Sequence, residues 1–229
     1  MLSYILVNPL FPITRVTAGG STYSDNVSLT FSSLYTKMIP FQILLKKNVR
    51  DNSGITPITY MEEYEYLNPQ HSFQTSKKIT DSKNIVVTNL NIFPMDYSSG
   101  TEGLINKNIV GVPIENVIFR TSGSVTNIMA GQLNIFDNYG MLSETFKLNK
   151  GLNLTDFKFS NQTKGKLPDL KAKTSFSADG NYYNVLKIIK KAANNKPLEI
   201  QLLANHIVYL WGYGGQYPIA EIKNAGYAE

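Results

Sequence analysis

Short runs of alternating apolar and polar residues, separated by turn-forming clusters, constrain the fold of this chain more than any other feature of its sequence. In one such run Val27, Leu29 and Phe31 alternate with serine and threonine, the period-two pattern of a strand with one solvated face. Further strand candidates, including a hairpin across residues 41–66, lie at residues 41–45, 84–93, 109–120, 131–136 and 198–203. Turn clusters bound these runs, so the sequence predicts a mainly β fold, either a sandwich or a barrel.

The segment at residues 179–203, DGNYYNVLKIIKKAANNKPLEIQLL, has a different pattern. The apolar residues that would form one helix packing face, at i, i+3, i+4 and i+7, are Tyr182, Val185, Leu186 and Ile189. Asp179 can cap the start of such a helix, and Asn194-Asn195 with Pro197 can end it. We therefore expect one packed α-helix at about residues 181–194, followed by a strand.

The length of 229 residues permits one large β domain or two smaller ones, since a domain averages about 150 residues. We expect a β-rich region at residues 1–140 and a β-barrel-like region with one helix at residues 141–229. The sequence leaves open whether residues 1–140 form a separate or inserted domain or share one sheet with the rest.

The surface of this chain is expected to be poor in charge, because only 17% of its residues are charged against about 25% in typical domains. Amides, hydroxyls and tyrosines must supply the polar surface, which suits packing against other chains but is shared by carbohydrate binders. The net charge is +5, yet the lysines are scattered in small groups and form no phosphate-tracking stripe. We therefore expect no specific nucleic-acid recognition.

The ends and the apolar runs of the sequence predict neither a signal peptide nor a membrane span. The N-terminal MLSYILVNPLFP lacks a basic start, and its apolar run breaks at Asn8-Pro9. No run approaches the roughly 20 apolar residues of a membrane span. We expect a chain made in the cytoplasm.

No motif for catalysis, cofactor binding or metal binding is recognised in the sequence. There is no cysteine, and the two histidines, His71 and His206, lack acidic spacing motifs. The acidic segment YMEEYEYL carries Glu62, Glu63 and Glu65. On a strand, Glu63 and Glu65 would project from one face and Glu62 from the other, which suits a solvated rim better than a glycosidase acid/base pair. We expect no enzyme, no catalytic residues, no cofactor and no metal.

An aromatic cluster near the C-terminus is the strongest candidate for an interface or a ligand site. Its members, placed around Gly212, Gly214 and Gly215, are Tyr209, Trp211, Tyr213 and Tyr217. Amphipathic rings of this kind anchor cores, protein interfaces and sugar-binding platforms. The sequence alone leaves these three roles open.

The order of elements in residues 147–223 resembles a known family. In this order, strands are followed by one aliphatic helix, a K-P-L-x-I-x-L strand at residues 196–202, a tight turn and a closing strand. The order is similar to that of the small β-barrel or sandwich with one packed helix found in bacteriophage tail and baseplate proteins. These include tail-tube, tail-terminator and distal-tail proteins. The resemblance implies a structural virion protein that forms rings with itself and neighbouring virion proteins. The basic charge favours a peripheral baseplate or collar component over a tube wall. The alternative hypothesis is a carbohydrate-binding or receptor-binding β-sandwich module.

Overall fold

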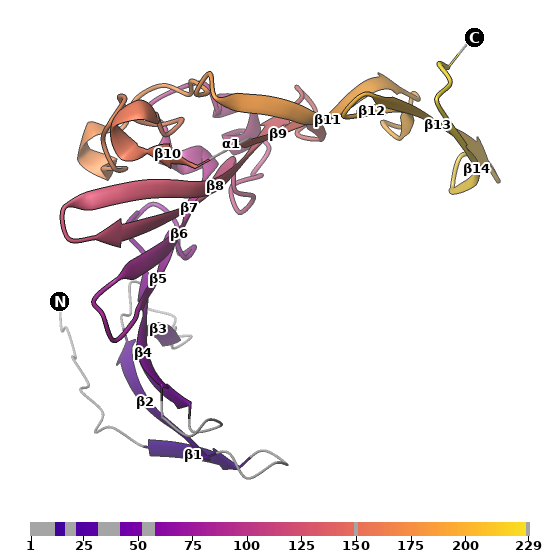
Figure 1. Ribbon diagram of the computed structural model, residues 1–229. Coiled ribbons are helices and arrows are strands. Elements are labelled where there is room, and N and C mark those ends of the chain that lie inside the picture. The colour runs from indigo at the N-terminus through magenta and orange to yellow at the C-terminus, as the bar shows by residue number, and fades with distance from the viewer. Residues whose placement is uncertain (1–11, 17–21, 32–41, 52–57, 149–150, 228–229) are drawn as a thin grey trace, which may run out of the picture. The chain divides into compact units, whose positions relative to one another are not determined.

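A computed structural model describes residues 12–16, 22–31, 42–51, 58–148 and 151–227 of the chain (Figure 1). The fold is mainly β, as the alternating sequence pattern predicts. The described helical elements are short, namely α1 (Glu102–Ile105) and the 3-10 turns η1 (Pro94–Asp96), η2 (Leu154–Asp156) and η3 (Leu170–Ala172). None of the helices in these described ranges is long and apolar enough to cross a membrane.

The chain forms two compact units, and the first comprises Met1–Leu90 and Ile118–Thr126. Its strands are β1 (Pro12–Val16), β2 (Thr22–Phe31), β3 (Gln42–Asp51), β4 (Ile58–Glu65), β5 (Ser76–Thr80) and β6 (Val86–Ile92). They pair antiparallel in chain order. Consecutive hairpins need only short connections, because antiparallel neighbours can be joined by a tight turn.

The second unit comprises Asn91–Val117 and Asn127–Glu229, so that β6, β7 and β8 contribute residues to both units. Its strands are β7 (Glu115–Ser122), β8 (Val125–Phe136), β9 (Leu142–Leu148), β10 (Leu152–Asn153), β11 (Tyr182–Lys191), β12 (Pro197–Leu202), β13 (Asn205–Gly212) and β14 (Tyr217–Lys223). From β8 the antiparallel order continues through β9, β11, β12 and β13 to β14, with β10 beside β8.

The sheet formed by the described residues is open, because the path of paired strands is linear and ends at β14. The finer prediction of a sandwich or a barrel is therefore not confirmed. The domain boundary expected at residue 140 stays a prediction, since the two units are groupings of packed residues and each draws on two separate stretches of chain.

The core of the second unit lies where the loop between β10 and β11 packs against the strands. Phe157 and Phe159, both fully buried, meet edge to face with ring centroids 5.0 Å apart. Backbone hydrogen bonds fix this loop: Ser98 N donates to Thr174 O at 3.0 Å, and Ser177 N donates to Ser160 O at 2.9 Å. The aromatic residues therefore act as the packing layer over this part of the sheet, the role that the sequence had assigned to a helix.

The prediction of a packed α-helix at residues 181–194 is wrong, because Tyr182–Lys191 forms strand β11 between β9 and β12. The residues assigned to the helix face do not share one packed surface. Tyr182, Val185 and Leu186 are half-buried, whereas Ile189 is 43% exposed. The expected stop at Asn194-Asn195 is a hairpin turn, in which Asn195 has φ 63° and its N–H donates to Ala192 O at 2.9 Å.

Register shifts in β11 explain why a strand carries a helical pattern. The pairing with β9 shifts between Asn184 and Leu186, and the pairing with β12 shifts between Ile188 and Lys190. Each bulge inserts one residue and breaks the two-residue alternation, so the apolar side chains recur at intervals of three and four. Two tyrosines, a valine and two isoleucines in this segment favour a strand by propensity.

Two neighbouring isoleucines distinguish the observed strand from the predicted helix. Ile188 faces Ile200, which in turn faces Ile207 in the next strand, whereas Ile189 is at a bulge and largely exposed. We expect Ile188→Ala to lower the free energy of unfolding by about 1–2 kcal/mol, because it removes a half-buried cross-strand contact. Ile189→Ala should cost clearly less. Urea denaturation of the two variants measures this order, and the reverse order would support the helix.

Candidate functional site

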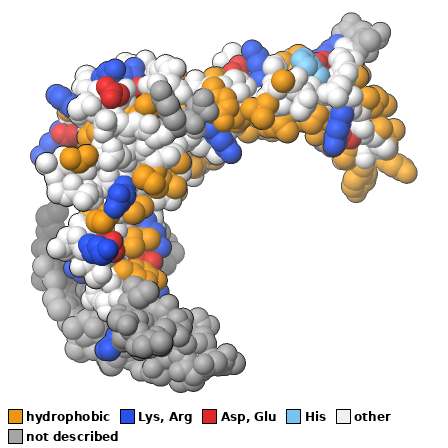
Figure 2. Space-filling model, in the orientation of Figure 1, with side chains coloured by type: hydrophobic (Ala, Val, Ile, Leu, Met, Phe, Trp, Pro, Cys, Tyr) orange, Lys and Arg blue, Asp and Glu red, His pale blue; other side chains and the backbone are white. Residues whose placement is uncertain are grey.

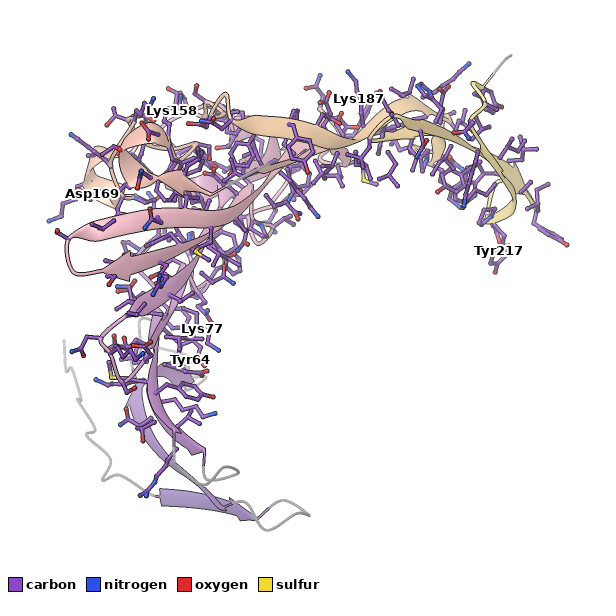
Figure 3. The ribbon with its side chains drawn as sticks, viewed as in Figure 1. Tyr64, Lys77, Lys158, Asp169, Lys187 and Tyr217 are labelled. Carbon is purple, nitrogen blue, oxygen red and sulfur yellow. The ribbon has the colours of Figure 1, made fainter. Side chains whose placement is uncertain are left out.

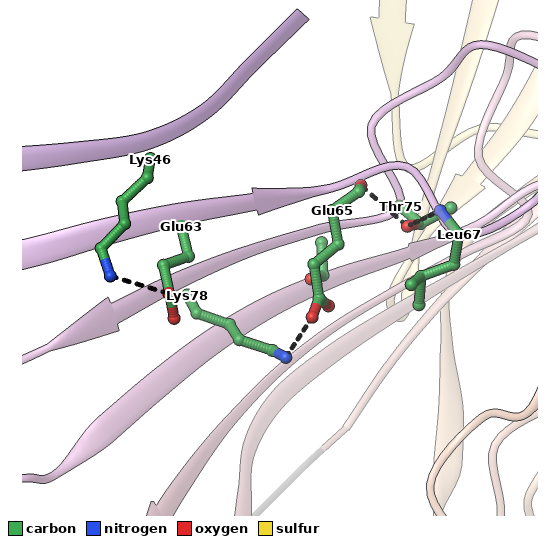
Figure 4. A network of polar contacts seen from close by, with 7 residues as sticks. Lys46, Glu63, Glu65, Leu67, Thr75 and Lys78 are labelled. Atoms are coloured by element: carbon green, nitrogen blue, oxygen red, sulfur yellow. Dashed lines mark hydrogen bonds and ion pairs between the residues drawn. The ribbon is translucent and has the colours of Figure 1, made fainter. Parts of the chain in front are cut away.

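The acidic residues of β4 form cross-strand ion pairs, of which Figure 4 shows those of Glu63 and Glu65. Glu63 lies between Lys46 and Lys78 of the adjacent strands, and its carboxylate is 3.5 Å from Lys46 Nζ. Glu65 pairs with Lys78 and accepts a hydrogen bond of 2.5 Å from Ser76 Oγ. Burial alone would raise the pKa of Glu65, but the hydrogen bonds from Lys78 and Ser76 hold this pKa below its usual value.

Glu62 projects from the opposite face of β4, as the period-two pattern predicts. It accepts a hydrogen bond of 2.6 Å from Tyr64 Oη and lies 3.0 Å from Lys77 Nζ, whose position beside Tyr64 is seen in Figure 3. Burial opposes ionisation of Glu62, yet these two partners lower its pKa, and burial together with Glu62 raises the pKa of Tyr64 to about 12. A general acid requires a raised carboxyl pKa, whereas the pKa values of Glu62 and Glu65 are lowered.

The two histidines take part in local contacts. His71 Nδ1 accepts a hydrogen bond of 3.2 Å from Phe73 N, and His206 Nδ1 lies 2.6 Å from Glu199 Oε1. Within the described ranges no group of three or more acidic or histidine side chains is placed to hold a metal ion.

A fully buried acidic residue of the second unit is Glu115, which the sequence analysis did not single out. Its side chain is fully buried at the start of β7. Ser160 donates to Oε2 from its N–H at 2.8 Å and from its hydroxyl at 2.5 Å, and Tyr182 Oη donates to Oε1 at 2.7 Å. Tyr97 Oη lies 2.7 Å from Ser160 Oγ and extends the network. This carboxyl group thus links three parts of the chain, namely β7, β11 and the loop that follows β10.

The environment of Glu115 shifts the pKa of its carboxyl group upward from the usual value. Burial is the largest influence and raises the pKa of this carboxyl group; the hydrogen bonds from Ser160 and Tyr182 oppose this rise, and the charge of Asp179 adds to it. The pKa of Tyr182 is also raised, by burial and by its hydrogen bond to Glu115. A buried carboxyl group with three donors acts as a structural tie, whose loss leaves donors without an acceptor.

The raised pKa of Glu115 predicts a specific dependence of stability on pH. Above the ordinary value of 4.5 the unfolded chain releases this proton while the folded chain retains it. The folded state then binds more protons, and the free energy of unfolding falls as pH rises, until the folded pKa is passed. Glu115→Gln cannot ionise, so the stability advantage of the wild type over this variant should shrink from pH 4 to pH 7. Urea denaturation of the wild type and of this variant at several pH values measures the difference in their free energies of unfolding. An advantage that grows with pH would contradict the assignment.

The four aromatic candidates occupy different environments around the β13–β14 hairpin. Tyr209 and Trp211 are half-buried, whereas Tyr213 is 79% exposed and Tyr217 61% exposed. Trp211 Nε1 donates to Pro197 O at 2.8 Å, and Lys196 Nζ lies 4.7 Å from the centroid of the Trp211 ring. Tyr213 and Tyr217 contact each other edge to face, with centroids 6.1 Å apart. Among these four candidates, the exposed rings are therefore those of Tyr213 and Tyr217.

Apolar side chains are exposed on both faces of the sheet at β12–β14, and Figure 2 shows hydrophobic side chains gathered over β14. On one face Val208 pairs with Ile222 and Leu210 with Ala220; on the other, Ile207 pairs with Lys223 and Trp211 with Pro218. The exposed members include Leu202, Leu210, Ile219 and Ile222. Ile207 and Val208 of β13 are buried within the chain, so the exposed apolar surface is formed by the neighbouring side chains on β12, β13 and β14.

No protein-family model matches this chain, and no curated protein or solved structure matches it either.

Proposed function

We propose that this chain is a structural protein that assembles with further copies of itself through the β12–β14 region. The observation that carries the proposal is the exposure of apolar side chains on both faces of one hydrogen-bonded layer, with Leu202 on one face and Leu210 and Ile222 on the other. Full burial of one such side chain contributes about 1.5–3 kcal/mol. A partner layer on either face would complete, between chains, the sandwich that the alternating pattern predicts.

The low charge of the chain supports the same proposal. Because 17% of the residues are charged, few ionised groups must be desolvated when two such surfaces meet. The charged residues on the apolar faces also carry both signs, since Glu221 and Lys223 of β14 lie 3.6 Å apart. Two identical surfaces with this arrangement have no net like-charge repulsion.

The setting proposed for this assembly is a phage tail, baseplate or collar, with neighbouring virion proteins as further partners. The segment that was expected to form the helix of this resemblance is strand β11. The remaining support for this setting is the order of the strands, the K-P-L-x-I-x-L segment and the tight turn. The proposal of self-assembly depends on the exposed surface and is independent of this setting.

Charge placed on the exposed surface should weaken self-association without unfolding the chain. Leu210 is 39% exposed and Ile222 42% exposed, so Leu210→Asp and Ile222→Asp should cost little folding stability but place a carboxylate in the contact. We expect wild-type oligomers that shift toward monomer in both variants, measured by light scattering over a concentration series. Val125→Asp, at a 54% exposed position on β8, is the matched control and should not alter the oligomer. A wild type that stays monomeric throughout contradicts the proposal.

Carbohydrate or receptor binding is the alternative function, and the exposed pair of Tyr213 and Tyr217 favours it. Stacked sugar rings use aromatic faces of this kind. If the alternative holds, a glycan array should show binding that Tyr217→Ala abolishes and Tyr217→Phe retains. An array without binding would remove this alternative and leave the assembly proposal untouched.

A further inference from the structure

The tip of the β13–β14 hairpin presents a tyrosine in an unfavourable backbone conformation. Tyr213 has φ 53°, and its side chain is 79% exposed. For a bulky L-residue this left-handed region costs roughly 1–2 kcal/mol, whereas glycine adopts it freely. The next two residues, Gly214 and Gly215, have positive φ as well, so the turn uses glycine where the side chain is dispensable. Strained residues of this kind cluster at functional contacts.

A pocket elsewhere in the second unit has the size of one aromatic ring. It lies between α1, the residues at the end of β8, and Phe176, and its volume is about 180 Å³. Typical ligand sites are larger, about 300–1,000 Å³, while an apolar cavity of about 150 Å³ in another protein accepts benzene. The apolar part of its lining includes Leu104, Ile114, Phe136 and Phe176.

The pocket also offers polar groups to a ring that carries a hydroxyl. Asn138 lines the pocket and is exposed. Asp137, which also lines it, is engaged by Lys191 and by the backbone N–H groups of Tyr139 and Met141. An aromatic ring with one terminal hydroxyl, which combines an apolar body with a polar tip, fits this lining better than a charged or purely apolar group.

We propose that Tyr213 of one copy of this chain inserts into the pocket between α1 and Phe176 of the next copy. This inference rests on the proposed self-assembly and adds to it a second contact, made by the tip of the β13–β14 hairpin. We call the exposed ring of Tyr213 the knob. Because the knob and the pocket are different surfaces, the contact is heterologous, and its repetition generates a ring or an open filament. Tyr217, 6.1 Å from Tyr213, supports the inserted ring from its edge.

Gly103 provides a way to close the pocket without damaging the fold. It lines the pocket from within α1, and a Cβ atom built on it meets no other atom within 4 Å. Gly103→Leu should therefore be tolerated and place a bulky side chain on the lining of the pocket, while the loss of a helical glycine should leave α1 no less stable. Gly103→Ala is the matched control, because its methyl group is too small to fill the space.

Tyr213 allows the complementary change on the knob. Tyr213→Gly removes the ring and the backbone strain together, so the chain should unfold at the same or a higher temperature while its self-association weakens. Tyr213→Phe retains the ring and should retain most of the association. A purely structural role for Tyr213 would instead make the glycine variant less stable.

The closing experiment measures self-association of the full chain by sedimentation velocity, with thermal unfolding of each variant as the check on folding. We expect Gly103→Leu and Tyr213→Gly each to raise the dissociation constant by about 30-fold, the effect of one interface hot spot, and Gly103→Ala and Tyr213→Phe to change it less than about 3-fold. If the wild type associates but neither Gly103→Leu nor Tyr213→Gly weakens it, the knob-and-pocket contact is overturned and the proposed function stands. A monomeric wild type overturns both.

Cross-linking identifies the two surfaces directly, because the chain has no cysteine. Gln216→Cys, beside the tyrosine pair, mixed with Asn138→Cys at the pocket, should give disulfide-linked heterodimers under mild oxidation. Gln216→Cys mixed with Lys164→Cys, which is also exposed, is the control. Heterodimer yields at least about 10-fold above this control support the contact, as expected for a high effective concentration of the two thiols, and equal yields overturn it.

Discussion

Antiparallel pairing between neighbouring strands is the constraint on which the rest of the structure depends. Each hairpin satisfies backbone hydrogen bonds with its neighbour, so the ladder extends as a single layer from one strand to the next. A single layer leaves two faces whose apolar side chains need cover, because a stable domain packs at least two layers around one core. Different parts of the structure cover these apolar faces in different ways.

In the middle of the second unit, the loop between β10 and β11 supplies the cover. Phe157 and Phe159 form the apolar part of the contact, and the carboxyl group of Glu115 forms the polar part through Ser160 and Tyr182. The apolar contact is non-directional, whereas the three hydrogen bonds to one buried carboxyl group fix where the loop lies. A buried, fully bonded polar group of this kind selects one arrangement of the loop over other compact ones.

Much of the strand pattern could be predicted from sequence. The runs at residues 84–93, 131–136 and 198–203 correspond to β6, the end of β8 and β12, and the faces assigned to Glu62 and Glu63 on β4 are confirmed. The helix failed because bulges in β11 mimic helical spacing. Glu115 was missed because its donors, Ser160 and Tyr182, are distant in sequence. The available signal was a single acid inside the apolar run IVGVPIENVIFR.

The left-handed conformation of Tyr213 and the exposed apolar side chains of β12–β14 both lower the stability of an isolated chain. The left-handed conformation of Tyr213 costs free energy that glycine would not, and exposed Leu210 and Ile222 forgo burial. Within the described residues, the ring of Tyr213 contacts the ring of Tyr217, with centroids 6.1 Å apart. Local conflicts of this kind are expected where a sequence serves a contact as well as a fold. An assembly that covers the exposed apolar side chains of β12–β14 and also holds Tyr213 in a contact would offset both costs, through two separate surfaces of the chain.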